Sequence, residues 1–128
     1  MTTMDIMAYD LLVAIGKCHR LLKNHADKLA SRSAVKTVTH WSDMPSIDDA
    51  FRLEEYVDTE LVDGEAVSWC LELTITPEGV RLVADVRRIH SIGQDVLVEV
   101  ADRQFTNLVD FPKAVIEVTE RLCASGPA

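Results

Sequence analysis

The 128-residue chain has little of what usually marks a reactive site. Its three cysteines are an odd number and include no Cys-x-x-Cys pair, so we expect free thiols and a reducing, cytoplasmic location instead of a disulfide framework. Its five glycines fall mostly in turn sequences, and the chain has no glycine-rich phosphate loop and no nucleophile elbow. The sequence therefore predicts a protein without enzymatic activity, metal or cofactor.

A long apolar run is also missing. The apolar positions of the N-terminal region are interrupted by Asp5, Asp10, Lys17 and Arg20. A signal peptide would instead show a positively charged segment, an uninterrupted apolar run and a small-residue cleavage site. We therefore expect neither a secretory signal nor a membrane-spanning segment, and no membrane partner.

Positive charge is scarce in most of the chain. Lys and Arg total 13 against 21 Asp and Glu, which gives a formal net charge of −8. Residues 1–46 hold six bases and four acids, so the excess of acid lies entirely in residues 47–128. Nucleic-acid binding depends on bases that neutralise phosphates, so we expect no nucleic-acid partner.

What the chain does contain is the pattern of an ordinary globular domain. Its length and its 48% of hydrophobic residues suit one domain spanning residues 1–128. In residues 4–29, apolar side chains recur at alternating spacings of four and three, which predicts an amphipathic helix. This stripe consists of Met4, Ala8, Leu11, Ile15, Cys18, Leu22, His25 and Leu29. The spacing also suits a coiled coil or a homodimer, but a helix lying across a sheet needs the same stripe, and we favour that packing.

Alternation of apolar and polar residues predicts four strands in succession, joined by short turns. The segments are 51–61, 65–76, 80–90 and 95–105, with Val96, Val98 and Val100 facing inward in the last. The Asp63-Gly64 pair is a strong hairpin signal. Short turns imply an antiparallel meander. We expect residues 31–46 to form a polar connection, in which residues 35–41 are either loop or a short edge strand.

A second helix is expected over residues 110–123. Asp110 can cap it, Pro112 lies in its first turn, and Phe111, Val115, Val118 and Leu122 form its buried stripe. A long N-terminal helix, a four-stranded antiparallel meander and a C-terminal helix make an α+β two-layer sandwich, with both helices on the apolar face of the sheet.

Three groups of residues are candidates for a reactive or metal-binding site. Cys18 and His25 share a helix face but lack further ligands of a recognisable pattern. Cys70 could meet His40 and His90 only through the fold, and its place on the polar side of a strand favours a structural role. The third group is Glu72, Asp85 and Glu99, where arginines on the same strands favour charge pairing on a solvated sheet face over paired-carboxylate catalysis.

The densest chemical signal is acidic. Residues 48–65 contain eight acids (Asp48, Asp49, Glu54, Glu55, Asp58, Glu60, Asp63 and Glu65) around the single base Arg52. Charges on an edge strand discourage edge-to-edge pairing, but that explanation does not account for the acids that continue into the turn. Aromatic residues near carboxylates are typical of protein-binding surfaces. We therefore predict a site for a basic protein partner, formed by Glu54, Asp58, Glu60, Asp63, Tyr56 and Trp41.

Two functions follow, from different classes. In size, charge and α+β build the chain is similar to small bacterial immunity proteins and secretion chaperones, which implies a non-enzymatic module that neutralises or escorts a basic partner. The alternative is a small-molecule-binding protein or a small enzyme that uses a pocket between sheet and helices, with Trp69, His90 and Arg87 near its mouth.

Overall fold

The computed structural model describes residues 3–44, 46–47, 50–107 and 109–127. Helix α1 opens the chain, helix α2 closes it, and strands β1 to β6 lie between them. Their bounds are α1 Thr3–Ala30, β1 Val35–Asp43, β2 Ser46–Ile47, β3 Ala50–Leu61, β4 Ala66–Thr76, β5 Gly79–His90, β6 Gly93–Phe105 and α2 Phe111–Cys123. Both predicted helices are confirmed to within a residue or two.

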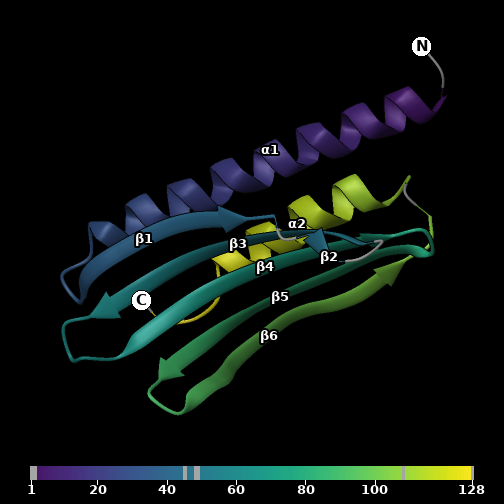
Figure 1. Cartoon of the computed structure of the whole chain (residues 1–128). Coiled ribbons are helices and arrows are strands. Elements are labelled where there is room, and N and C mark those ends of the chain that lie inside the picture. The colour runs from purple at the N-terminus through teal and green to yellow at the C-terminus, as the bar shows by residue number, and fades with distance from the viewer. Residues whose placement is uncertain (1–2, 45, 48–49, 108, 128) are drawn as a thin grey trace.

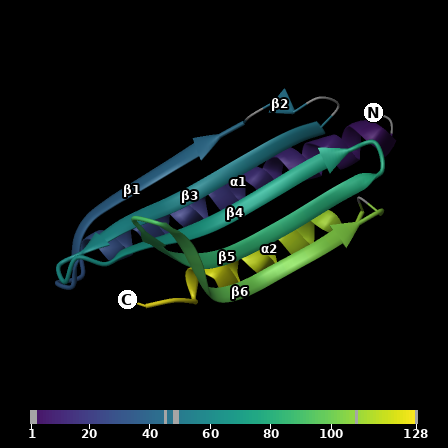
Figure 2. The same ribbon diagram turned by 60° about the horizontal axis from the view of Figure 1, so that its bottom comes forward.

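The strands form one antiparallel sheet in the order β1-β3-β4-β5-β6, and the two-residue strand β2 pairs with β3. Both helices lie on the same face of this sheet (Figure 1), α1 over β1 and β3, and α2 over β4, β5 and β6. Figure 2 shows the sheet from its other side, which carries no helix. The α+β two-layer sandwich is therefore confirmed, with five long strands instead of four.

The additional strand is β1, in the segment where residues 35–41 were expected to be either loop or a short edge strand, so the edge-strand alternative is confirmed. It pairs with β3 from Val35 opposite Leu61 to Asp43 opposite Glu54. A bulge between Val35 and Thr37 shifts the alternation by one residue. Because the bulge breaks the period of two, and β1 is an edge strand with mostly exposed side chains, the sequence shows only a weak strand signal here.

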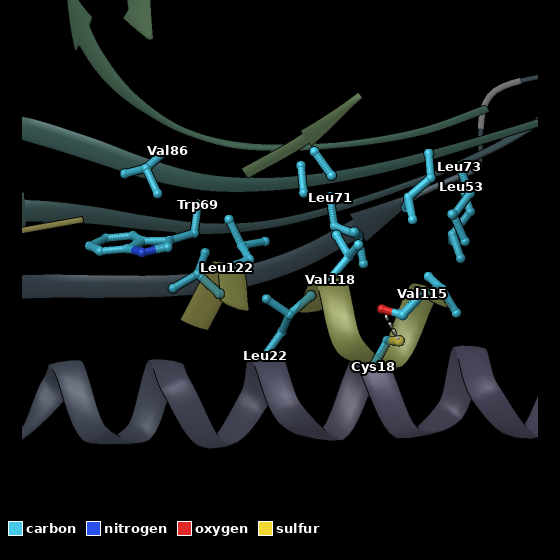
Figure 3. Packing of buried hydrophobic residues seen from close by; sticks show 14 of the residues in the cluster. Cys18, Leu22, Leu53, Trp69, Leu71, Leu73, Val86, Val115, Val118 and Leu122 are labelled. Atoms are coloured by element: carbon cyan, nitrogen blue, oxygen red, sulfur yellow. Dashed lines mark hydrogen bonds between the residues drawn. The ribbon is translucent and has the colours of Figure 1, made fainter. Parts of the chain in front are cut away.

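The core fills the space between sheet and helices (Figure 3). Leu22 of α1, Trp69 of β4, and Phe111 and Leu122 of α2 are among its fully buried side chains. Each contributes about 1.5 to 3 kcal/mol through removal of apolar surface from water. The Trp69 indole N–H donates to the carbonyl oxygen of Ser125 at 2.8 Å, so the segment after α2 satisfies the one polar atom of this side chain.

The β6 prediction is correct in position but wrong for Val96, which is exposed. Two register shifts in the β5–β6 pairing leave Val100 and Leu97 without a direct partner. Each shift reverses the side of the sheet that the following residues face. Val98 and Val100 still pack against the core, whereas Val96 lies opposite Arg87. The end of the β5–β6 hairpin bends over the helix-free face of the sheet (Figure 2).

Local signals at the turns and helix ends are mostly confirmed. The β3–β4 turn closes with a hydrogen bond from the Gly64 N–H to the Leu61 carbonyl, 3.0 Å long, and Gly64 adopts a φ of 93°. Pro112 lies in the first turn of α2 as expected, but the Asp110 side chain makes no capping hydrogen bond there.

Among the described residues, neither helix combines the length and apolarity needed to cross a bilayer.

Candidate functional site: an acidic sheet face and a histidine–carboxylate cluster

Strand β3 sends its side chains alternately to the two faces of the sheet. Leu53, Glu55 and Val57 are buried beneath the helices. Glu54 and Tyr56 lie on the face without helices, which we call the open face. The strand therefore presents two rows of side chains, and among the described acids of the acidic stretch Glu55 is the one on the covered side.

Acids from three neighbouring strands gather on the part of the open face formed by β1, β3 and β4. We call Asp43, Glu54, Asp58, Glu60 and Glu72 the acidic face. Glu54 is directly opposite Glu72 across the β3–β4 pair. Two carboxylates in this arrangement repel each other. Each carboxylate forms one long ion pair, Glu54 with Arg52 at 3.5 Å and Glu72 with Arg87 at 3.9 Å.

Tyr56 lies between these two carboxylates. Its hydroxyl oxygen is 3.1 Å from Glu54 Oε2 and 3.3 Å from Glu72 Oε1, so it can donate to either one. Burial, together with the charges of Glu72 and Glu54, raises the pKa of Tyr56 above its usual range. The hydroxyl therefore stays protonated and remains a donor, but it can satisfy only one carboxylate at a time.

Trp41 on β1 completes the site by stacking on Tyr56. Their ring centroids are 4.4 Å apart with an interplanar angle of 21°. The Trp41 indole N–H donates to Asp58 at 2.5 Å, and the Ser68 hydroxyl donates to the other oxygen of Asp58, also at 2.5 Å. Asp58 therefore holds the indole in position, while Trp41 keeps 41% of its surface exposed. The structure brings four of the six predicted residues together here: Trp41, Glu54, Tyr56 and Asp58.

The other two predicted residues lie toward the end of β3. Glu60 is exposed and pairs with Lys36 at 3.5 Å. Asp63 is in the β3–β4 turn, where its carboxylate accepts a hydrogen bond from the backbone N–H of Glu65 at 2.9 Å. Asp63 thus shapes the turn as well as adding charge to it. Asp48 and Asp49, which begin the acidic stretch of the sequence, lie outside the described residues.

A cavity of about 200 Å³ on the open face borders the Trp41–Tyr56 stack. Arg87 lines it and is held by Asp85 at 2.7 and 3.0 Å and by Gln94 at 3.1 Å. Cys70 lines it too, and burial raises the pKa of this thiol to about 12. A thiol with such a pKa is a poor nucleophile at neutral pH.

The residues proposed for the alternative function do not meet. Trp69 is buried in the core, whereas Arg87 lies on the open face, so the sheet separates them. A cavity of about 600 Å³ lies where α2 meets β6 and is lined by Arg103, Glu117, Val118, Glu120, Arg121 and Ala124, with none of the three expected residues among them. A mouth formed by Trp69, His90 and Arg87 between sheet and helices is therefore wrong.

The sequence analysis missed a second cluster, on the covered side of the sheet. His19 of α1, His40 of β1 and Glu55 of β3 place one ligand atom each within 4.8 Å of one another. His19 Nδ1 is 2.5 Å and His40 Nε2 is 3.7 Å from Glu55 Oε1. The available signal was Glu55 itself, an acid at an inward position of an otherwise apolar row.

Comparison with protein-family models, with curated proteins and with solved structures finds no match for this chain.

Proposed function

We propose that this chain is a non-enzymatic interaction module that binds a basic protein partner on its acidic face. The observation that carries the proposal is the Glu54–Glu72 pair beside the Trp41–Tyr56 stack. The pair concentrates negative charge that Arg52 and Arg87 neutralise only in part, because Arg87 lies closer to Asp85 than to Glu72. The stack offers a partly exposed aromatic surface next to it. A Lys or Arg side chain of a partner suits both features.

The energetics favour an external cation at this place. Like charges directly opposite on neighbouring strands cost stability, so a partner's cation between Glu54 and Glu72 relieves an unfavourable interaction. A cation over an aromatic ring contributes about 0.5 to 2 kcal/mol, depending on how far it is desolvated. Negative charge spread over the rest of the acidic face accelerates encounter with a basic surface.

The general build of the chain supports the same class of function. Small immunity proteins and secretion chaperones, to which the chain is similar in size, charge and α+β architecture, act by binding another protein. The cysteines Cys18, Cys70 and Cys123 are free, which suits the reducing cytoplasmic location included in this proposal. We include the expectation of no nucleic-acid partner, because the acidic face would repel phosphates.

Affinity capture with a charge-neutralised variant tests the proposal. The variant combines Glu54→Gln, Glu60→Gln and Asp63→Asn, and it retains Asp58 because that side chain anchors both Trp41 and Ser68. We expect the wild type to retain a basic protein from native lysate at low salt and to release it at high salt. For the purified partner, we expect the variant to bind about tenfold more weakly or worse by calorimetry.

A control with the same change in net charge makes the test specific to one face. Glu78→Gln, Glu117→Gln and Glu120→Gln neutralise three exposed acids in the β4–β5 turn and on α2. This control should bind like the wild type, and both variants should unfold at temperatures close to that of the wild type. Equal capture by all three proteins, or capture that is insensitive to salt, would contradict the proposal.

A further inference from the structure

We propose that His19, His40 and Glu55 bind a divalent transition-metal ion, with Zn²⁺ as the best fit, and leave one coordination position open. The three residues come from α1, β1 and β3, so the site exists only in the folded chain. It lies between the sheet and α1, on the opposite side of the sheet from the acidic face. It is therefore independent of the proposed partner-binding function.

The spacing of the ligand atoms is close to that of a tetrahedral site. In such a site, zinc lies about 2.0 to 2.2 Å from nitrogen and oxygen ligands, which puts the ligands roughly 3.4 Å from one another. The distances to Glu55 Oε1 are 2.5 Å from His19 Nδ1 and 3.7 Å from His40 Nε2, on either side of that value. All three ligand atoms lie within 4.8 Å of one another, so rotation of the exposed His19 side chain would have to bring the separations toward the tetrahedral value.

Burial and unmet hydrogen bonding at this cluster suit a bound metal ion. Glu55 is 2% exposed, and the ion pairs that the structure gives it are both with histidines. Among the described residues, Glu55 Oε2 and His40 Nε2 are buried polar atoms with no hydrogen-bond partner. Unsatisfied buried polar atoms are rare in folded proteins, and an ion is one of the few groups that satisfies both a carboxylate and an imidazole.

The donor set selects the metal. Two imidazoles and one carboxylate favour zinc and its transition-metal neighbours, whereas Mg²⁺ and Ca²⁺ favour sites made of oxygen atoms. Three protein ligands leave a fourth tetrahedral position for water or for an incoming group. Solvent can reach that position, because the His19 side chain is 54% exposed while those of His40 and Glu55 are 13% and 3% exposed.

Metal binding would fasten α1 to the edge of the sheet. His19 lies in the middle of α1, and His40 lies on β1, the edge strand beneath this helix. The apolar stripe of α1 packs on the core through Cys18 and Leu22. The cluster adds a polar link between α1 and the edge of the sheet beside this apolar packing.

Calorimetric titration of untagged, chelator-treated protein with Zn²⁺ tests the proposal. We expect one Zn²⁺ bound per chain and an increase in unfolding temperature, because an ion that binds only the folded chain stabilises it. The Co²⁺-substituted protein should show the visible absorption of a tetrahedral site with nitrogen and oxygen donors. Thiolate-to-cobalt absorption would instead place the metal on a cysteine and overturn the assignment.

Variants identify the ligands. His19→Ala and His40→Ala should each weaken Zn²⁺ binding about tenfold or more, and Glu55→Gln should abolish the zinc-dependent rise in unfolding temperature. His90→Ala is the control, because His90 pairs with Asp95 at 3.2 Å in the β5–β6 hairpin and should not alter binding. His19 is largely exposed, so its variant keeps the test valid if the buried replacements fail to fold.

Two results would overturn the proposal. In the first, the wild type binds no zinc and its unfolding temperature does not change. In the second, zinc binds with the same affinity in the His19→Ala variant, which would move the metal elsewhere on the chain. Loss of binding in the His90→Ala control would have the same meaning as the second result.

Discussion

His25 is a buried histidine whose surroundings disfavour the protonated, charged form of its ring. It lies against Trp69 with ring centroids 5.0 Å apart in an edge-on arrangement. Within the described part of the chain, its Nε2 atom has no hydrogen-bond partner. Burial, helped by the positive charges of Arg32 and Lys28, lowers the pKa of His25 to about 4. The imidazole is therefore neutral in the folded state at pH 7.

This residue makes stability depend on pH in the mildly acidic range. The unfolded chain binds a proton at His25 with a pKa of about 6.5, whereas the folded chain does so only near pH 4. Between these values the unfolded state holds more protons, so stability is full above pH 6.5 and falls as the pH drops toward 4. We expect His25 to account for a loss of about 2 to 3 kcal/mol, measured by urea unfolding over this range.

The variant His25→Leu isolates that contribution. It removes the titrating group and keeps an apolar side chain against Trp69. The stability difference between wild type and variant should therefore change between pH 6.5 and 4, whereas carboxylates elsewhere affect both proteins equally. A difference that does not vary with pH would show that His25 is not buried as a neutral base.

At the scale of elements, the β4–β5 turn depends on one glycine. Gly79 has a φ of +148°, in a region that residues with side chains rarely adopt. A Cβ atom at this position would lie 2.3 Å from the Phe105 carbonyl oxygen at the end of β6. The close approach of two backbones thus joins the turn to the neighbouring strand.

Two glycine-to-alanine substitutions should have opposite effects. Gly79→Ala should lower the free energy of unfolding by at least about 2 kcal/mol, because both the backbone conformation and the contact with Phe105 are incompatible with a side chain. Gly16→Ala in α1 meets open space, so it should raise stability by up to about 1 kcal/mol through helix propensity. Urea unfolding at a fixed protein concentration compares them, and equal effects would contradict this description of the turn.

Elements with an uninterrupted period were predictable, and those with bulges were not. The predicted stripe of α2 is fully buried, as are Cys18, Leu22, His25 and Leu29 of the α1 stripe. In β4 the inward residues from Val67 to Leu73 are buried as expected, but Ser68 and Cys70 on its polar side are buried as well. Strands β1 and β6 contain register shifts, which invert the alternation partway along. A single sequence gives no sign of an inserted residue, so the sequence predicts residues 35–41 only as either loop or a short edge strand and places Val96 on the wrong side.

At the scale of the whole molecule, the two sites differ in how far sequence reasoning could reach them. The residues of the acidic face are mostly near one another along the chain, so their composition alone made them visible. Glu72 and Asp43 join that face only through strand pairing. The histidine–carboxylate cluster combines α1 with β1 and β3, and only the packing of α1 on the sheet brings it together.

The homodimer stays a prediction, and the exposed side of α1 is where it can be tested. Tyr9, Leu12 and Val13 lie within one helical turn, and Leu12 is 68% exposed. We expect the wild type to self-associate as its concentration rises in analytical ultracentrifugation. Leu12→Lys should weaken this association about tenfold or more.

Val109→Lys is the control for the dimer, because it adds the same charge at another exposed apolar residue, between β6 and α2. Its association should match that of the wild type. A wild type that stays monomeric at every concentration would contradict the homodimer.

The pairing of β1 with β3 has a consequence for how this chain can evolve. His40 and Trp41 are adjacent in sequence, as are Glu54, Glu55 and Tyr56, yet neighbours in each group face opposite sides of the sheet. Substitutions at alternate positions can therefore adapt the acidic face to a new partner without touching the histidine cluster. Insertion of one residue in either strand would instead exchange the two sets of side chains, so selection should tolerate replacements here and remove insertions and deletions.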